Sequence, residues 1–177
     1  MHSITTQRLL LRPFSAPDKQ LYFNLYMNPE VMRLICPPFN KQQAQEGYQR
    51  TLKQIDLKGN KRLSWVIVDK NIEQDLGIIG LSWDQESDDI INTGVILKRF
   101  GKGYGTESLG ALAEYSFSHL NVKRITAQLA SRNLPSENML KKLGFHFIES
   151  DNAEIKSCYL EPAEQAGNYI QKVLINA

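Results

Sequence analysis

Three glycines, at positions 101, 103 and 105, alternate with other residues in the stretch KRFGKGYGTESL, which spans residues 98–109. An apolar run typical of a β-strand, residues 90–97, leads into this stretch, and an amphipathic helical pattern follows it. Because glycine has no Cβ and tolerates positive φ, such a turn can direct successive backbone N–H groups toward one point. The following helix adds the free N–H groups and partial positive charge of its N-terminus. The sequence therefore predicts a strand–turn–helix unit that can bind a phosphate or pyrophosphate.

The spacing of these glycines excludes three common nucleotide-binding motifs. A Walker A loop needs a glycine, four residues and then Gly-Lys-Ser/Thr, which this stretch does not contain. A Rossmann motif would need glycine at Thr106 or Ser108, and the glycine loop of protein kinases fails for the same reason. A turn that uses small residues only for packing is the alternative interpretation. The alternation of three glycines around Lys102 at a helix start favours anion binding.

The segment 101–107 resembles the acetyl-coenzyme A loop of the GNAT acetyltransferase superfamily, whose pattern is Gln/Arg-x-x-Gly-x-Gly/Ala. Phe100 occupies the Gln/Arg position, and an aromatic residue there is similar to the branch that acetylates protein N-termini, notably those of ribosomal proteins. Residues 6–14, TQRLLLRPF, are similar to the opening strand of that branch. Residues 133–145 are similar to its second motif, an Asn-x-x-Ser pattern followed by Gly-Phe. The resemblance covers residues 6–175.

This resemblance implies that the chain binds acetyl-coenzyme A and no metal. The loop amides would hold the pyrophosphate, the strand at 95–97 would border the pantetheine arm, and Asn133 would orient the cofactor. Lys141 can meet the 3′-phosphate, although a cation near a helix C-terminus also has an ordinary electrostatic explanation. The expected cofactor-binding residues are Val95, Ile96, Leu97, Phe100, Gly101, Lys102, Gly103, Tyr104, Gly105, Thr106, Asn133, Ser136, Asn138 and Lys141.

Moving an acetyl group from a thioester to an amine requires close approach of the two reactants, stabilisation of an oxyanion, and proton transfer. A backbone N–H on the 95–97 strand is the expected oxyanion donor. Ser136 is the expected proton donor, because Leu140 stands where many family members carry tyrosine; a hydroxyl bonded to the first helical turn is the equal alternative. Asn92 stands where the family often has glutamate, and an amide accepts no proton at neutral pH. The base is then another carboxylate or a water chain, or the amine arrives neutral.

The expected reaction is direct attack by a primary amine, first of all a protein N-terminus. A route through Cys36 or Cys158 is disfavoured, because neither cysteine lies near a motif. Acetylation of a small amine, such as a polyamine or an aminoglycoside, is the alternative, as is a non-catalytic module that binds coenzyme A. A pocket for the acceptor can be walled by Trp83, Tyr26 and Phe39, although such aromatics also fit a core.

An acidic turn over residues 84–89 gives a further hypothesis about the acceptor. Asp84 and the other acidic residues of this turn can attract a cationic amine. A solvated hairpin tip explains the same composition more simply.

Composition restricts the number of domains, the class of partner and the location that the chain can have. A chain of 177 residues, 42% hydrophobic and 23% charged, fits one globular domain over residues 1–177. The net charge of +2 gives no support for a nucleic-acid partner. The two cysteines show no metal-ligand spacing and suggest reduced thiols in a cytoplasmic protein. No apolar run approaches 18 residues, so we expect no membrane span and no signal peptide. The chain is expected to be either a monomer or a homodimer.

Hydrophobic periodicity predicts an α/β protein. Its order of elements agrees with the GNAT fold that the resemblance implies: a mixed, mostly antiparallel sheet of six to seven strands flanked by about four helices. The strand–helix–strand unit over residues 90–129 should be a parallel crossover, and its two strands should splay apart. Strands or extended segments are expected at 8–12, 63–68, 76–83, 90–97, 124–129, 145–149, 155–160 and 169–175, and helices at 15–27, 41–57, 106–120 and 133–144.

Overall fold

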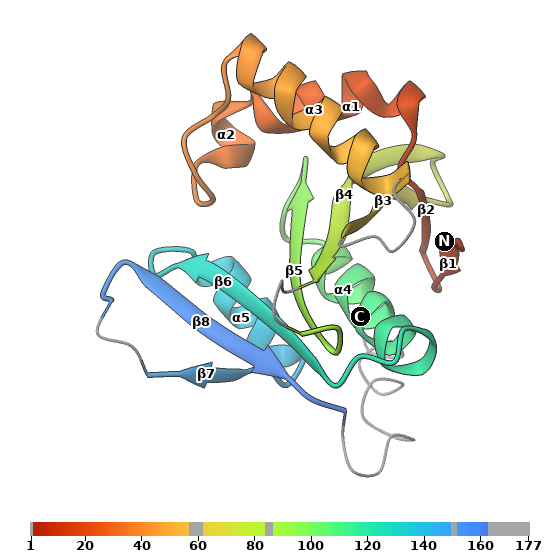
Figure 1. Ribbon diagram of the computed structural model, residues 1–177. Coiled ribbons are helices and arrows are strands. Elements are labelled where there is room, and N and C mark those ends of the chain that lie inside the picture. Colours follow the sequence, from red (N-terminus) through yellow and green to blue (C-terminus); the bar gives the residue numbers. More distant parts are fainter. Residues whose placement is uncertain (1, 57–61, 84–86, 150–151, 163–177) are drawn as a thin grey trace.

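The computed structural model describes residues 2–56, 62–83, 87–149 and 152–162. Over these ranges the chain forms one mixed sheet with helices on both faces (Figure 1). Its strands are β1 (Ile4–Thr5), β2 (Leu9–Pro13), β3 (Arg62–Asp69), β4 (Gln74–Trp83), β5 (Ile90–Leu97), β6 (Arg124–Ala130), β7 (His146–Ile148) and β8 (Ile155–Leu160). The helices are α1 (Lys19–Tyr26), α2 (Pro29–Met32), α3 (Lys41–Asp56), α4 (Tyr104–His119) and α5 (Leu134–Lys142), with a 3-10 turn at Ala16–Asp18.

The predicted fold class is confirmed, with a few corrections to its elements. The described residues contain eight strands, because the two-residue strand β1 pairs with β2 and gave no pattern in the sequence. Asn28 does not only end the first helix: its side chain accepts hydrogen bonds from the N–H groups of Glu30 and Val31, at 2.9 and 3.3 Å, and so caps α2. Pro29 fits the first position of α2, where no N–H donor is needed. The strand expected at 169–175 lies outside the described residues.

One joint in the sheet differs from all the others. The strand order is β1-β2-β3-β4-β5-β6-β8-β7, and every neighbouring pair is antiparallel except β5 and β6. These two strands run parallel, joined through α4, and pair over only three positions, from Ile90↔Arg124 to Asn92↔Thr126. Beyond Asn92 they diverge, as Figure 1 shows. The predicted parallel crossover and splay are therefore both present.

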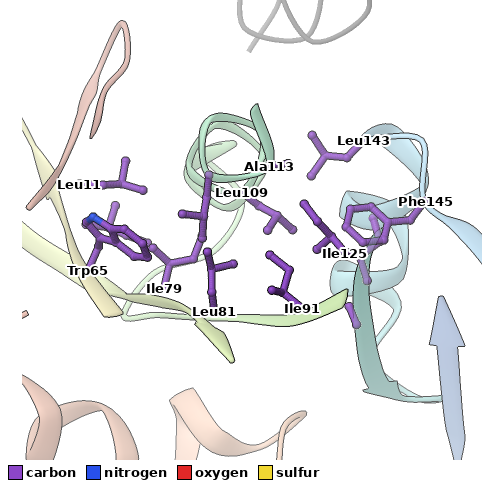
Figure 2. Close-up of a cluster of buried hydrophobic side chains, with 14 of the residues drawn as sticks. Leu11, Trp65, Ile79, Leu81, Ile91, Leu109, Ala113, Ile125, Leu143 and Phe145 are labelled. Carbon is purple, nitrogen blue, oxygen red and sulfur yellow. The ribbon is translucent and has the colours of Figure 1, made fainter. Parts of the chain in front are cut away.

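The sheet separates two hydrophobic clusters. On one face, Leu109 and Ala113 of α4 pack above Trp65, Ile79 and Ile91, which come from three adjacent strands (Figure 2). The other face lies under α1, α2 and α3 (Figure 1). There Val66 and Ile78 belong to the cluster formed with the helical residues. Alternate residues of each strand thus serve opposite faces, as the period of a β-strand requires. The second face is the one on which the candidate site is built.

Gly77 gives a test of how tightly the strands pack beside the first cluster. It lies where the pairing of β3 with β4 shifts register, and a Cβ there would lie 2.0 Å from the backbone oxygen of Ile96. Gly77→Ala must therefore move a strand, and we expect it to lower the free energy of unfolding by about 2 kcal/mol in urea denaturation. Gly94→Ala is the matched control, because a Cβ on Gly94 meets nothing within 4 Å. Equal stability of Gly77→Ala and the wild type would contradict this packing.

Candidate active site

The glycine turn predicted from the sequence has the backbone needed to present N–H donors. Gly101 and Gly103 both adopt positive φ, of 86° and 76°, and α4 begins directly after Gly103. A Cβ on Gly101 would meet nothing within 4 Å, so the space over the turn is open. The N–H groups from Arg99 to Thr106 donate no hydrogen bond to any described residue. The turn and the helix start therefore offer a row of unused donors.

A buried ion pair stabilises this turn. The Glu107 side chain, 2% exposed, accepts hydrogen bonds from Thr6 Oγ1 at 2.5 Å, Arg8 N at 2.9 Å and Arg8 Nε at 2.6 Å. The same guanidinium donates through Nη1 to the backbone oxygen of Lys102 at 3.0 Å and lies 5.1 Å from the centre of the Tyr104 ring. Tyr104 in turn donates to Asp69 at 2.6 Å. The start of β2 and the end of β3 thus fix the turn and the first turn of α4.

The divergence of β5 from β6 leaves backbone groups of β5 without a strand partner. Lys98 N–H donates to Leu76 O at 2.8 Å, so the residues at 98, 96 and 94 direct their backbone groups toward β4. The intervening residues, Thr93, Val95 and Leu97, direct theirs toward the gap left by β6. The N–H of Val95 therefore faces the gap, where the sequence predicted an oxyanion donor.

A cleft of about 510 Å³ lies at this gap and continues under the first three helices. Its floor is hollow because Ser64, Gly80 and Gly94 stand side by side on β3, β4 and β5 and carry little or no side chain. Asn92 and Ser82 border one side of the floor, while the wall beside the gap is formed by residues of β5, β6, α4 and α5. The residues of that wall are Thr93, Val95, Ile96, Leu109, Ala127, Gln128, Leu129, Ala130, Asn133, Ser136, Met139 and Leu140.

Asn133 joins the two sides of the cleft. Its Oδ1 accepts a hydrogen bond from Ser136 N at 3.2 Å and so caps α5, and its Nδ2 donates to the backbone oxygen of Leu34 at 3.1 Å. Because Asn133 caps the helix, the hydroxyl of Ser136 is not used for that purpose. Ser136 lines the cleft, where its hydroxyl can meet a ligand.

The acceptor side of the cleft carries aromatic side chains. Tyr26 lies between Tyr22 and Phe39, with ring centres 4.1 and 5.2 Å away. Tyr22 and Tyr26 line the cleft, and burial raises the pKa of both hydroxyls, so each remains a protonated donor at neutral pH. Trp83 lines a second hollow of about 300 Å³ that shares Asn92 with the cleft. Asp84 lies outside the described residues.

Several expected ligand residues do not line the cleft. Phe100 is 60% exposed, and Lys102 and Asn138 are exposed too. Lys141 pairs with Glu137 at 2.7 Å. Gly105 serves packing, because a Cβ there would lie 2.8 Å from Met139 Sδ, and Thr106 is buried in the first turn of α4.

Other lining residues had no signal in the sequence. Tyr22, Ser64 and Arg62 converge on the cleft only through the register of strands and the packing of α1. No described carboxylate lines either hollow, so the base expected from the chemistry is not among these residues.

Comparison with known proteins adds to this geometry. The sequence matches the family described as acetyltransferase (GNAT) domain over residues 8–146. The chain belongs to the GNAT acetyltransferase family. It is therefore an acyltransferase enzyme, as the glycine turn and the second motif implied. Among the described residues, no helix is long and apolar enough to cross a bilayer, and no group of three or more His, Cys, Asp or Glu is arranged to hold a metal ion.

Individual GNAT proteins resemble the chain over most of its length. It is 29% identical over 149 residues to the uncharacterized N-acetyltransferase p20 of Bacillus licheniformis. The aligned region covers 82% of this chain and 83% of p20. A spermidine N-acetyltransferase from Vibrio cholerae, solved with CoA and spermine, superposes with a TM-score of 0.73 at 21% identity, covering 88% and 96% of the two chains. A ribosomal-protein-S5-alanine acetyltransferase from Vibrio fischeri superposes at 0.75 and 20% identity, covering 93% and 98%. These two likenesses show the fold, and the resemblance to the ribosomal-protein branch stays a prediction.

The buried carboxylate of Glu107 gives a pH-dependent prediction. Burial by itself would raise the pKa of Glu107, but the hydrogen bonds from Thr6 and Arg8 outweigh burial and hold the pKa below its ordinary value of 4.5. The ionised carboxylate therefore stabilises the fold at neutral pH, and this stabilisation is lost as the pH falls through the acidic range below 4.5. We expect Glu107→Gln to lower the free energy of unfolding by about 2 kcal/mol at neutral pH, since Arg8 is partly exposed.

Urea unfolding from about pH 7 to about pH 3 measures this effect, and the difference between wild type and Glu107→Gln should narrow as the pH falls. Glu114→Gln is the control, because Glu114 is exposed on the same helix. A difference that stays constant over that range would show that the Glu107 charge is not the stabilising feature.

Proposed function

We propose that the chain transfers an acetyl group from acetyl-coenzyme A to a primary amine by direct attack, with both reactants bound in the cleft. The observation that carries this proposal is the presence of two sets of unused backbone donors on one stretch of chain. One set lies at the positive-φ glycines and the start of α4, and the other lies on β5 where it leaves β6. A long ligand with a pyrophosphate at one end and amide groups along its arm matches both sets.

The residues present fit the cofactor. The amides from Gly101 to Thr106 would hold the pyrophosphate, and the backbone groups of Thr93 and Leu97 would pair with the amides of the pantetheine arm. When bound, the thioester supplies an activated acetyl group. Val95 N–H is the donor that the chain offers to the acetyl oxygen, and a backbone donor of this kind needs no reorganisation when charge develops.

Proton transfer uses the remaining polar groups of the cleft. The hydroxyl of Ser136 is available to donate a proton to the thiolate of coenzyme A that leaves as the amine takes the acetyl group. It is free for this role because Asn133 caps the helix. The cleft wall is mostly apolar, and burial of an amine in such surroundings disfavours its charged form. The acceptor can therefore lose its proton to water as it enters, which is consistent with the absence of a carboxylate among the described lining residues.

A protein N-terminus is the acceptor class that we propose first. The branch resemblance in the glycine loop and in residues 6–14 supports it, as does the likeness in fold to the ribosomal-protein-S5-alanine acetyltransferase. The likeness to the spermidine N-acetyltransferase supports a small polyamine in the same way. Both acceptors require the same chemistry at Val95, and they differ in the charge that they bring into the cleft.

The two cysteines are free thiols, which supports a cytoplasmic location.

A variant of the glycine turn tests the cofactor site. Gly103→Val places a β-branched residue at a φ of 76°, with its Cβ 3.3 Å from Arg8 Nη2. We expect the affinity for coenzyme A, measured by calorimetry, to fall at least tenfold, and the release of free thiol from acetyl-coenzyme A with an amine panel to fall with it.

Gly144→Val is the matched control, because Gly144 has a φ of 85° at the end of α5 and lies outside the cleft. If both variants bind coenzyme A like the wild type, the turn is not the pyrophosphate site. If the wild type binds coenzyme A but turns over no amine, the chain is the non-catalytic module instead.

Cys36 tests direct attack against a covalent route. It lines the cleft, but burial raises the pKa of its thiol, so the nucleophilic thiolate is scarce at neutral pH. Burial also raises the pKa of Cys158, to about 11. We therefore expect Cys36→Ser to keep kcat within about threefold of the wild type in the thiol-release assay. Loss of turnover with retained coenzyme A binding would support an acetyl-cysteine route.

A further inference from the structure

The charge of the cleft lining constrains which acceptors the cleft can bind. Among the described residues that line it, one side chain is charged, and that is the guanidinium of Arg62. No aspartate or glutamate is among them. A cleft that received a polycation would gain from carboxylates and would be opposed by an arginine. The lining instead favours an acceptor that carries a negative charge.

Arg62 stands at a defined place on the floor of the cleft. It begins β3, and the register places it opposite Ser82 of β4, which in turn lies opposite Asn92 of β5. The neighbouring row, Ser64, Gly80 and Gly94, is almost without side chains. The long side chain of Arg62 therefore borders a hollow that no other side chain of the floor fills.

The described part of the chain leaves the guanidinium of Arg62 without a partner. Its side chain forms no ion pair or hydrogen bond with any described residue, whereas Arg8, Arg12 and Arg124 each pair with a carboxylate. The hydroxyls of Tyr22 and Tyr26 line the same cleft; burial raises their pKa values, and the positive charge of Arg62 lowers them in part. The Tyr26 hydroxyl donates to Tyr22, which leaves the Tyr22 hydroxyl and the guanidinium as donors, and these match an anionic acceptor group.

The distance from Arg62 to the transfer point limits the size of the acceptor. Val95 and Arg62 lie on β5 and β3, two strand spacings or about 10 Å apart, and the register also sets them three positions, or about 10 Å, apart along the strands. The amine must reach the end of the cleft next to Val95, and the extended Arg62 side chain shortens the remaining span. The anionic group therefore lies a few bonds from the amine.

We propose that the acceptor carries a carboxylate within about 10 Å of its amine, and that Arg62 binds this carboxylate as the specificity-determining residue. The inference rests on the proposed function, since it names the acceptor class for the same site. Two sources share this chemistry: a free amino acid, and a peptide N-terminus with an acidic residue among its first positions. Polyamines, which lack a carboxylate and carry a second cation, are poor acceptors by the same reasoning.

Matched acceptor pairs test the proposal in a thiol-release assay with acetyl-coenzyme A. One arm compares free amino acids with their carboxamides. The other compares the peptide amide Ser-Asp-Ala-Ala with Ser-Asn-Ala-Ala, and spermidine is measured beside both. We expect the wild type to favour the acid over its amide at least tenfold in kcat/KM in one arm, and that arm identifies the source. Spermidine should be used less well than the preferred acid.

Variants of Arg62 then assign the preference to this residue. Arg62→Met should reduce the acid-to-amide ratio to about one, and Arg62→Lys should keep part of it, because the charge remains while the bidentate geometry is lost. Arg33→Met, which removes an exposed arginine outside the cleft, should behave like the wild type. Calorimetry with coenzyme A checks that each variant still folds and binds the cofactor.

The outcomes separate the two levels of the proposal. Turnover of amines with no preference for the acid, a preference for spermidine, or a preference that survives in Arg62→Met would overturn the carboxylate proposal and leave the transferase function intact. Absence of thiol release with every amine would overturn the transferase function and this inference together.

Discussion

The short parallel joint between β5 and β6 is the constraint on which the rest of the structure depends. Each strand is held along most of its length by an antiparallel neighbour, β5 by β4 and β6 by β8, so the joint can remain at three residue pairs. Leu109, Met139 and Leu140 reach the gap from α4 and α5 and line it with apolar atoms. Buried backbone groups without partners are costly. The freed edge of β5 is therefore completed by water or by a ligand that carries amides of its own.

The ion pair of Arg8 with Glu107 explains why two distant motifs occur in one chain. Arg8 directly precedes β2, and Glu107 lies in the glycine-loop motif 99 residues later. The carboxylate takes donors from Thr6 and Arg8, and the guanidinium continues to the backbone oxygen of Lys102. The opening strand thus supports the turn whose amides face the open space. A sequence pattern that looks like two separate signals is physically one unit.

Local patterns predicted most of the fold, and distances along the chain limited what could be predicted about the site. Period and turn residues were sufficient for β5, α4 and α5, because those signals lie within each element. They were insufficient for β1, whose two residues carry no period, and for α2, which depends on the Asn28 cap. Motifs alone carry the expectation that the glycine turn, the Val95 edge and Ser136 belong to the site. Arg62, Ser64 and Gly80 reach the cleft through cross-strand register, which no local pattern shows.

The lack of a carboxylate among the described lining residues also bears on the kind of amine that the cleft can use. A peptide α-amine has a pKa near 8, whereas a lysine-type alkylamine has a pKa near 10.4, a difference worth about 3 kcal/mol of deprotonation at neutral pH. Without a strong base in the cleft, an alkylamine would have to bear this difference in the transition state. A peptide N-terminus loses its proton to water far more readily, and the apolar wall favours its neutral form. Between a peptide N-terminus and a polyamine, the chemistry of the cleft therefore favours the peptide N-terminus.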